Sequence, residues 1–123
     1  MRRLNRNFAA AGHDVTGEQW RILMSLWRKD GQRQQDLADF AYKDKTSITR
    51  IIDSMEKRDL VVRVPDRLDR RQKLIYLTDK GKRQQESLMQ IVRETSLEAQ
   101  QGIEPEHLDV FKDVLAKIRD NLS

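Results

Sequence analysis

The sequence has no cysteine and little proline or glycine. Without cysteine the chain can form no disulfide, bind no metal through thiolates and carry no cysteine redox switch. Only two prolines and five glycines occur among 123 residues, so few positions interrupt a helix and we expect helices to dominate. The sequence also lacks an apolar run near the roughly 20 residues of a membrane helix and a signal-like start, which predicts a cytoplasmic protein.

The chain also lacks the residue sets that enzymes and metal sensors use. His13 and His107 are the only histidines and lie far apart in the sequence, which argues against a transition-metal site. No motif supplies a nucleophile, a base and an orienting group, so a small hydrolase is disfavoured. We therefore expect no enzymatic activity, no cofactor and no metal. At 123 residues, the chain is expected to form one domain, 1–123, around one core.

Positive charge is concentrated in one part of the sequence. Residues 43–73 contain ten Lys or Arg and six Asp or Glu, so this segment carries the whole formal net charge of +4. A concentrated basic surface attracts the dense phosphates of a duplex and releases counterions on binding. Double-stranded DNA is therefore the partner that the charge pattern favours.

Two consecutive helices within this region have the pattern of a helix-turn-helix. Residues 34–41 read as a short helix, and residues 46–58 as a second one with an apolar stripe at Ile48, Ile51, Ile52 and Met55. The second helix of such a motif contacts bases through its first turns, where short polar side chains allow close approach. The candidate DNA-binding residues of this predicted recognition helix are Lys45, Thr46, Ser47, Thr49 and Arg50.

The periodicity then changes from helical to alternating. Residues 60–64 and 73–77 predict two strands rich in β-branched residues, joined by a charged turn at 65–72. This β-hairpin would be the wing of a winged helix-turn-helix spanning residues 31–78. Its candidate DNA-binding residues are Arg67, Asp69, Arg70, Arg71 and Lys73.

Helices are predicted on both sides of this lobe. Residues 1–12 contain a helix with Leu4 and Phe8 one turn apart, residues 16–29 form a helix capped by Thr16, and residues 79–101 form a long helix capped by Thr78. A last helix after Pro105 has an apolar face too large for one chain to leave exposed. Residues 1–12 and 79–123 are therefore assigned to a helical dimerisation lobe, with these interface candidates: Leu4, Phe8, Leu108, Phe111, Leu115, Ile118 and Leu122.

The order of these elements and several short strings together resemble the MarR (multiple antibiotic resistance regulator) family. The strings are Leu37-Ala38, residues 47–53, residues 55–61, Asp69-Arg70-Arg71 and residues 77–81. The resemblance covers nearly the whole chain from Val15. It implies a bacterial or archaeal homodimer in which the first and last helices of both subunits interleave and two winged modules bind one pseudo-palindromic operator. We expect a bacterial transcription regulator, and most simply a repressor.

The resemblance also assigns roles to individual residues. Residues 46–50 would begin the recognition helix, Arg71 would enter the minor groove, and Asp69 would pair with an arginine and hold the wing in shape. Asp59 stands where members of the family commonly have glycine, and aspartate tolerates the left-handed backbone that this turn would need. Many relatives also bind small aromatic or phenolic anions, which suggests an effector cleft near His13, Trp20, Arg21 and Trp27.

Two other functions remain open from the sequence. A winged helix can serve as a protein-interaction module, but such a module would not need basic residues at both the recognition helix and the wing. A nonspecific architectural DNA-binding protein would share the same electrostatics. Only a strong preference for one site over random DNA distinguishes that alternative from a sequence-specific regulator.

Overall fold

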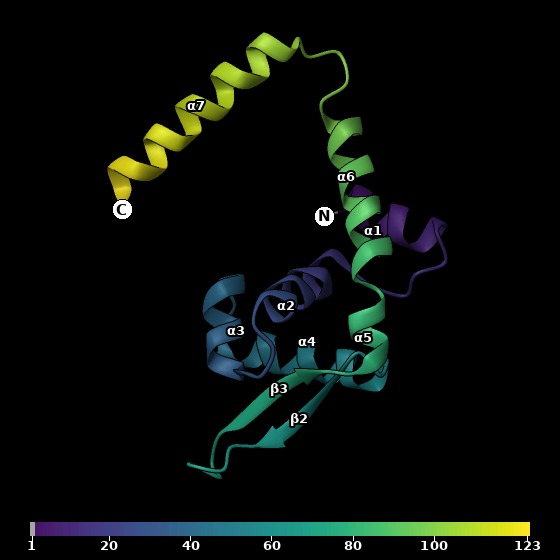
Figure 1. Ribbon diagram of the computed structural model, residues 1–123, viewed down its shortest axis with the longest axis vertical. Coiled ribbons are helices and arrows are strands. Elements are labelled where there is room, and N and C mark those ends of the chain that lie inside the picture. Colours follow the sequence, from purple (N-terminus) through teal and green to yellow (C-terminus); the bar gives the residue numbers. More distant parts are fainter. Residues whose placement is uncertain (1) are drawn as a thin grey trace.

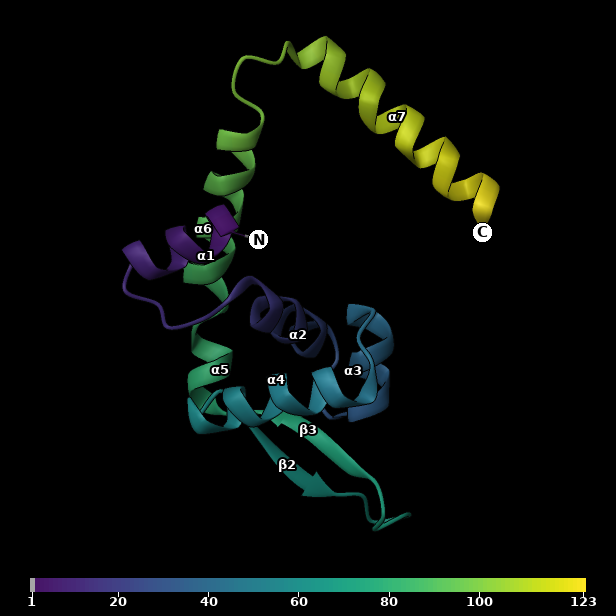
Figure 2. The ribbon, with the colours of Figure 1, turned by 180° about the vertical axis from the view of Figure 1, so that it is seen from behind.

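The computed structural model describes residues 2–123; residue 1, which the predicted helical lobe includes, lies outside the described residues. In this part of the chain, a body of helices with a small sheet at one end continues into two long helices that lead away from it (Figures 1 and 2). The mainly helical fold with a β-hairpin, predicted from the sequence, is confirmed. The elements are α1 (Arg2–Ala10), α2 (Gly17–Arg28), β1 (Gln32–Arg33), α3 (Gln34–Ala41), α4 (Lys45–Lys57), β2 (Val61–Pro65), β3 (Lys73–Leu77), α5 (Asp79–Arg83), α6 (Gln85–Ala99) and α7 (Pro105–Leu122).

Side-chain caps start three of the helices. The Oγ1 of Thr16 accepts a hydrogen bond from the backbone N–H of Gln19, while the Gln19 side chain accepts one from the N–H of Thr16, which completes a capping box on α2. Asp44 caps α4 through Ser47, and Thr78 caps α5 through Gly81. These caps satisfy backbone donors that a helix leaves without partners, and so they fix where each helix begins.

The sheet has one strand more than the sequence predicted. Its order is β1-β3-β2, with both pairs antiparallel, and β1 contributes only the pairs Gln32↔Ile75 and Arg33↔Leu74. Two polar residues are too few to give an alternating pattern, so the strand could not be read from the sequence. Gly31 precedes it with φ of +73°, and a Cβ there would lie 2.7 Å from the ring of Tyr76.

The core joins both lobes of the chain. Helix α2 lies at its centre and contributes Ile22, Leu23 and Leu26, which are buried. The other buried apolar side chains come from α1 through α6: Phe8, Val15, Leu37, Ala38, Ala41, Ile48, Ile52, Met55, Leu60, Val61, Ile75, Leu77, Leu88 and Ile91. The recognition helix α4 is therefore anchored to the same core as α6.

The predicted single helix over residues 79–101 is two helices in the structure. A turn at Gln84 separates the five-residue α5 from α6. Helix α5 packs so closely on the end of α4 that a Cβ at Gly81 would collide with the backbone oxygen of Leu60. Direct contact between α5 and the end of α4 is therefore possible only because residue 81 has no side chain.

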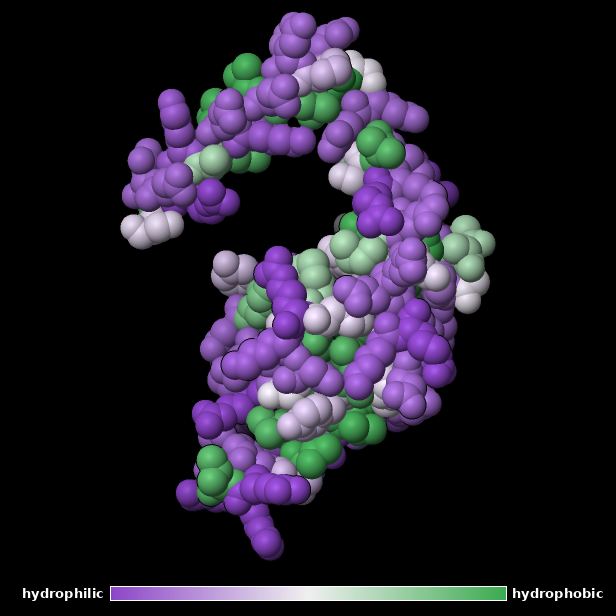
Figure 3. All heavy atoms as spheres, in the orientation of Figure 1, coloured by the Kyte–Doolittle hydropathy of each residue, from purple (hydrophilic) through white to green (hydrophobic). Residues whose placement is uncertain are grey.

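Helix α7 lies away from the body of its own subunit. None of its 18 residues is buried, although apolar side chains gather along it (Figure 3). Phe111, Leu115 and Ile118 are 60%, 48% and 51% exposed. No helix within residues 2–123 is both long enough and apolar enough to cross a membrane.

Candidate nucleic-acid interface

The exposed face of α4 carries the predicted DNA-binding residues. Ile48, Ile52 and Met55 are buried on its other face, which fixes the rotation of the helix about its axis. Lys45, Thr46 and Arg50 are consequently exposed, while Ser47 and Thr49 are half-buried. The structure therefore presents all five predicted residues in the first two turns of α4.

Asp44 holds the first turn of α4. Its Oδ1 accepts a hydrogen bond of 2.7 Å from the backbone N–H of Ser47. This bond, together with further hydrogen bonds from Ser47 and Thr46 and the charge of Arg50, lowers the pKa of the Asp44 carboxyl. The cap is therefore ionised at neutral pH, where its negative charge also complements the positive end of the helix dipole.

The hydroxyl of Thr49 makes two hydrogen bonds within the protein. It donates to the backbone oxygen of Lys45 over 2.8 Å and accepts a 2.7 Å hydrogen bond from the Nε2 of Gln34. Gln34 is the first residue of α3, so the first helix of the motif fixes a side chain of the second. This role of Gln34 could not be predicted from the sequence, because it depends on how the two helices cross.

Arg63 neutralises two carboxylates on α4. Its guanidinium lies 2.7 Å from the Oδ1 of Asp53 and 2.8 Å from the Oε1 of Glu56, and its side chain is only 14% exposed. Both carboxylates would otherwise repel phosphate near the recognition helix. The alternation of β2 gave a signal for this residue, because it places Arg63 on the same side of the strand as the buried Val61.

Two aspartates shape the wing. The Oδ1 of Asp66 accepts from the N–H of Leu68 over 2.9 Å, and the Oδ1 of Asp69 accepts from the N–H of Arg71 over 3.1 Å. Asp69 also lies 3.4 Å from the Nε of Arg71, which is the pairing that the resemblance implied. The Arg71 side chain remains 93% exposed. Asp66, which is buried, was not among the sequence candidates.

Basic residues from α4, β1, β3 and the wing turn line one hollow of about 450 Å³. The basic lining residues are Lys45 at the start of α4, Arg71 of the wing turn, Lys73 of β3 and Arg33 of β1. The remaining lining residues are Gln34, Gln35, Asp36, Ile48 and Gln72. The hollow therefore joins the two predicted DNA-binding elements. Arg33 was missed because β1 itself was not predicted.

The other wing candidates lie apart from this hollow. Arg67 lines a second hollow, with Val64, Pro65, Asp66, Leu74 and Tyr76. Arg70 is exposed at the tip of the hairpin. The structure therefore separates Arg71 and Lys73, which lie beside α4, from Arg67.

The predicted dimerisation residues divide into two groups. Phe8, expected at the interface, is fully buried in its own subunit, and Leu4 packs against the same core. The reason is that α1 packs on α6, where the Nδ2 of Asn7 donates to the Oγ1 of Thr95 over 2.7 Å. The candidates on α7 remain available: Leu108 is partly exposed and Phe111, Leu115, Ile118 and Leu122 are exposed.

The predicted effector residues lie on and before α2. Trp20 and Trp27 pack against the core, and Arg21 and His13 are partly exposed. The indole N–H of Trp27 donates to the backbone oxygen of Gly81 over 3.0 Å, so it has a structural partner. The Nε1 of Trp20 is buried without a hydrogen-bond partner.

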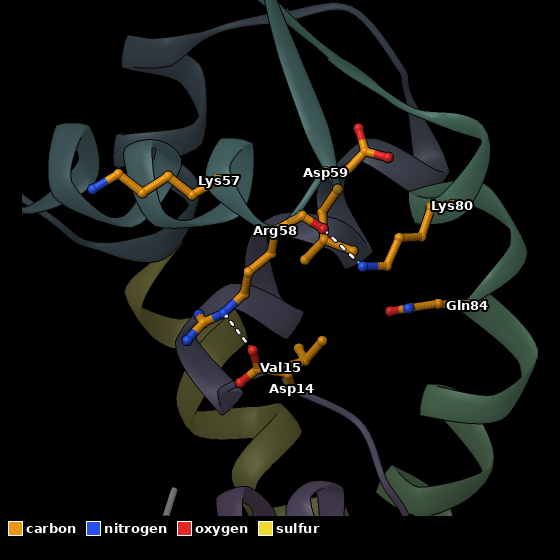
Figure 4. Close-up of a pocket in the computed structure, with 8 residues that line it drawn as sticks. Asp14, Val15, Lys57, Arg58, Asp59, Lys80 and Gln84 are labelled. Carbon is orange, nitrogen blue, oxygen red and sulfur yellow. Dashed lines mark hydrogen bonds and ion pairs between the residues drawn. The ribbon is translucent and has the colours of Figure 1, made fainter.

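The end of α4 is joined to neighbouring segments around another hollow, of about 390 Å³ (Figure 4). Asp59 follows the helix with φ of +60°, the left-handed backbone expected from the sequence. Arg58 forms a 3.0 Å ion pair with Asp14, and its backbone oxygen accepts from the Nζ of Lys80 over 2.8 Å. These contacts connect the recognition helix to the segment before α2 and to α5.

Comparison with known proteins matches residues 15–73 to the MarR family. No curated protein matches the chain. Among solved structures, MarR from E. coli is 24% identical with a TM-score of 0.84, over 95% of this chain and 86% of that one. PcaV from Streptomyces coelicolor in complex with its natural ligand is 21% identical with a TM-score of 0.78, over 97% and 85%. AbfR bound to DNA is 22% identical with a TM-score of 0.71, over 98% and 82%. At these identities, the structural likeness establishes a shared fold.

Proposed function

We propose, from the match of residues 15–73 to the MarR family, that the chain is a homodimeric, sequence-specific transcription regulator of that family. The observation that carries the proposal is the shared hollow in which Lys45 of α4 lies beside Arg71 and Lys73 of the wing region. Cations from both elements would bind one stretch of duplex, with α4 in the major groove and Arg71 in the adjacent minor groove.

A second copy of the chain would complete the regulator. Helix α7 has an exposed apolar face that its own subunit does not cover, and this supports dimerisation through α7. Two winged modules related by a two-fold axis would then bind two half-sites about 10 bp apart, centre to centre. The operator would be pseudo-palindromic. A bound dimer would exclude RNA polymerase from an overlapping promoter in the bacterial cytoplasm. We therefore propose that the protein represses transcription.

A small aromatic or phenolic anion would release the operator. PcaV, a neighbour in fold, was solved with its natural ligand, and the buried Nε1 of Trp20, one of the four predicted effector residues, has no hydrogen-bond partner within residues 2–123. Trp20→Phe would remove that donor and keep an aromatic ring. Titration of benzoate-class anions, followed by tryptophan fluorescence and operator release, tests this part of the proposal; no saturable change in the parent protein would contradict it.

Selection of bound sequences from random duplexes tests the DNA-binding proposal. We expect enrichment of one site with two-fold symmetry, and a footprint that covers both half-sites. Arg50→Ala should weaken binding to that site by roughly 1–3 kcal/mol and relax the choice of one base, as for a direct major-groove contact. Binding to all sequences with similar affinity would instead indicate an architectural protein, and absence of DNA binding would favour a protein-interaction module.

A further inference from the structure

Three consecutive backbone oxygens, those of the C-cap residue of α4 and of the two residues after it, accept hydrogen bonds from Thr78 and Lys80 at the start of α5. The Nζ of Lys80 donates to Arg58 over 2.8 Å, the hydroxyl of Thr78 donates to Asp59 over 2.5 Å, and the N–H of Thr78 donates to Leu60 over 3.0 Å. Arg58 is the C-cap residue of α4, and Asp59 and Leu60 form the turn that follows it, so donors to these oxygens fix how the chain leaves the helix. We call this set of bonds, made by Thr78 and Lys80, the α4–α5 clamp.

The clamp lies between the two functional parts of the chain. Helix α4 carries the predicted DNA-binding residues, while α5 leads through Gln84 into α6 and from there to α7. Figure 4 shows Lys80 extending from α5 to the oxygen of Arg58. On the other side, the Arg58 guanidinium is held by Asp14 and by the Oγ of Ser54, at 3.0 and 2.9 Å. The last turn of α4 is thus fixed between the segment before α2 and α5.

A small tilt at the C-terminal end of α4 produces a large displacement of its first turn. A 13-residue helix is about 20 Å long, so a tilt of about 5° at its clamped end would move its first turn by about 2 Å. Lys45 and Thr46 in that turn would move with it. A displacement of this size changes whether a side chain meets the edge of a base.

We propose that Lys80 is a positioning residue that fixes the direction of α4 relative to the dimerisation helices and so sets the half-site spacing that the dimer accepts. This inference rests on the proposed function of the chain as a dimeric DNA-binding protein. Lys80 acts through the backbone of Arg58 and needs no contact with DNA. Its ammonium also lies at the negative end of the α4 dipole, which favours a cation there.

The matched variants are Lys80→Met, Lys80→Arg and Lys82→Met. Methionine keeps most of the aliphatic stem of Lys80 and removes the donor, whereas arginine keeps a cationic donor. Lys82 is exposed on the same helix, so its replacement removes the same charge at a similar place. All three are prepared as full-length protein, and the thermal midpoint and the dimer mass of each are measured first.

The first measurement needs no DNA. Amide hydrogen exchange at residues 58–61 is compared between the parent and the three variants. We expect exchange in Lys80→Met to be about tenfold faster, since one charge-assisted hydrogen bond is lost, and to be unchanged in Lys82→Met. Unchanged exchange in Lys80→Met would overturn the inference, whether or not the protein binds DNA.

The second measurement uses the selected operator and versions of it with one or two base pairs added between the half-sites. Each added pair moves the second half-site by about 3.4 Å and turns it by about 34°. The parent, Lys80→Arg and Lys82→Met should lose at least about tenfold in affinity per added pair, whereas Lys80→Met should lose about threefold or less. The positioning role is overturned if Lys80→Met discriminates between spacings as the parent does. If Lys80→Met does not fold, Lys80→Gln, which also removes the charge, takes its place. Failure of both variants to fold overturns the positioning role as well. A parent that selects no operator would instead contradict the proposed function.

Discussion

The Nε2 of Gln34 donates a 2.7 Å hydrogen bond to the Oγ1 of Thr49, and the same hydroxyl donates to the backbone oxygen of Lys45. The hydroxyl of Thr49 is therefore engaged within the protein on both its donor and acceptor sides. Only one lone pair of the hydroxyl remains, so we expect the methyl group, which makes no hydrogen bond, to be the main part of the side chain that contacts a base. Threonine methyls pack against the methyl group of thymine in the major groove.

This arrangement predicts opposite effects for two replacements of Thr49. Thr49→Ser keeps the hydroxyl and removes the methyl, so affinity at the selected site should fall about fourfold, or roughly 0.8 kcal/mol for one lost methyl contact. Thr49→Val keeps the methyl and should preserve the base preference. Binding to operators with each of the four bases at the affected position measures both. Loss of preference in Thr49→Val alone would show that the hydroxyl contacts the base.

Arg71→Ala should abolish most of the affinity for operator without affecting folding. The side chain is 93% exposed, and exposed substitutions usually change stability by less than about 0.5 kcal/mol. The thermal midpoint and the dimer mass should therefore remain those of the parent. The slope of log affinity against log salt should fall by about one unit, because one phosphate-neutralising cation is lost.

Asp69→Ala should give a milder loss than Arg71→Ala. It removes the carboxylate that holds the N–H and the Nε of Arg71, yet it leaves the guanidinium in place. The salt slope should consequently stay close to that of the parent while the affinity falls. An Arg71→Ala protein that binds operator as tightly as the parent would exclude the wing from recognition.

Gly81→Ala should destabilise the fold. A Cβ at this position would collide with the backbone oxygen of Leu60, and a backbone atom cannot move aside as a flexible side chain can. Overpacking of this kind costs about 1–3 kcal/mol, which urea denaturation measures directly. Lys82→Ala, on an exposed neighbour, is the control and should be nearly neutral. Equal stabilities of the two variants would mean that α5 shifts to accommodate the methyl group.

A charge on the apolar face of α7 should separate the subunits. Leu115 is 48% exposed in the single chain and lies on the same face as Phe111 and Ile118. Leu115→Glu would place a carboxylate in the proposed interface, so sedimentation at micromolar concentration should detect monomer. Asp113→Lys, on the opposite face of the helix, should remain dimeric. A dimeric Leu115→Glu protein would place the interface elsewhere.

The Asp44 cap predicts a pH dependence. Because the pKa of Asp44 is lowered in the fold, its stabilising effect is complete above the unfolded value and is lost as the pH falls through the folded value. Asp44→Ala should therefore be less stable than the parent at pH 7, and the difference should shrink at acidic pH below 3.8. A difference that stays constant across this range would remove ionisation of Asp44 as the cause.

The sequence predicted best the features that repeat or that have a local signature. The stripe of Ile48, Ile52 and Met55 predicted the rotation of α4, and Thr16 and Thr78 marked two helix starts. The helical spacing of Leu4 and Phe8 correctly indicated that Phe8 would be covered by other side chains. Periodicity cannot show whether those side chains belong to the same chain or to a second copy. The ion pairs of Arg63 likewise depend on how β2 meets α4, which is a property of the tertiary fold.

Helix α7 also affects how long a subunit can survive alone. Most of the stability of a protein helix comes from packing of its apolar face, and the described structure buries none of the residues of α7. A newly synthesised chain that meets no second copy would therefore keep a fraying helix of apolar residues, which is a preferred substrate for cellular proteases. Association would protect both chains at once. The intracellular lifetime of the protein would then rise with its own concentration, so that degradation removes single subunits first.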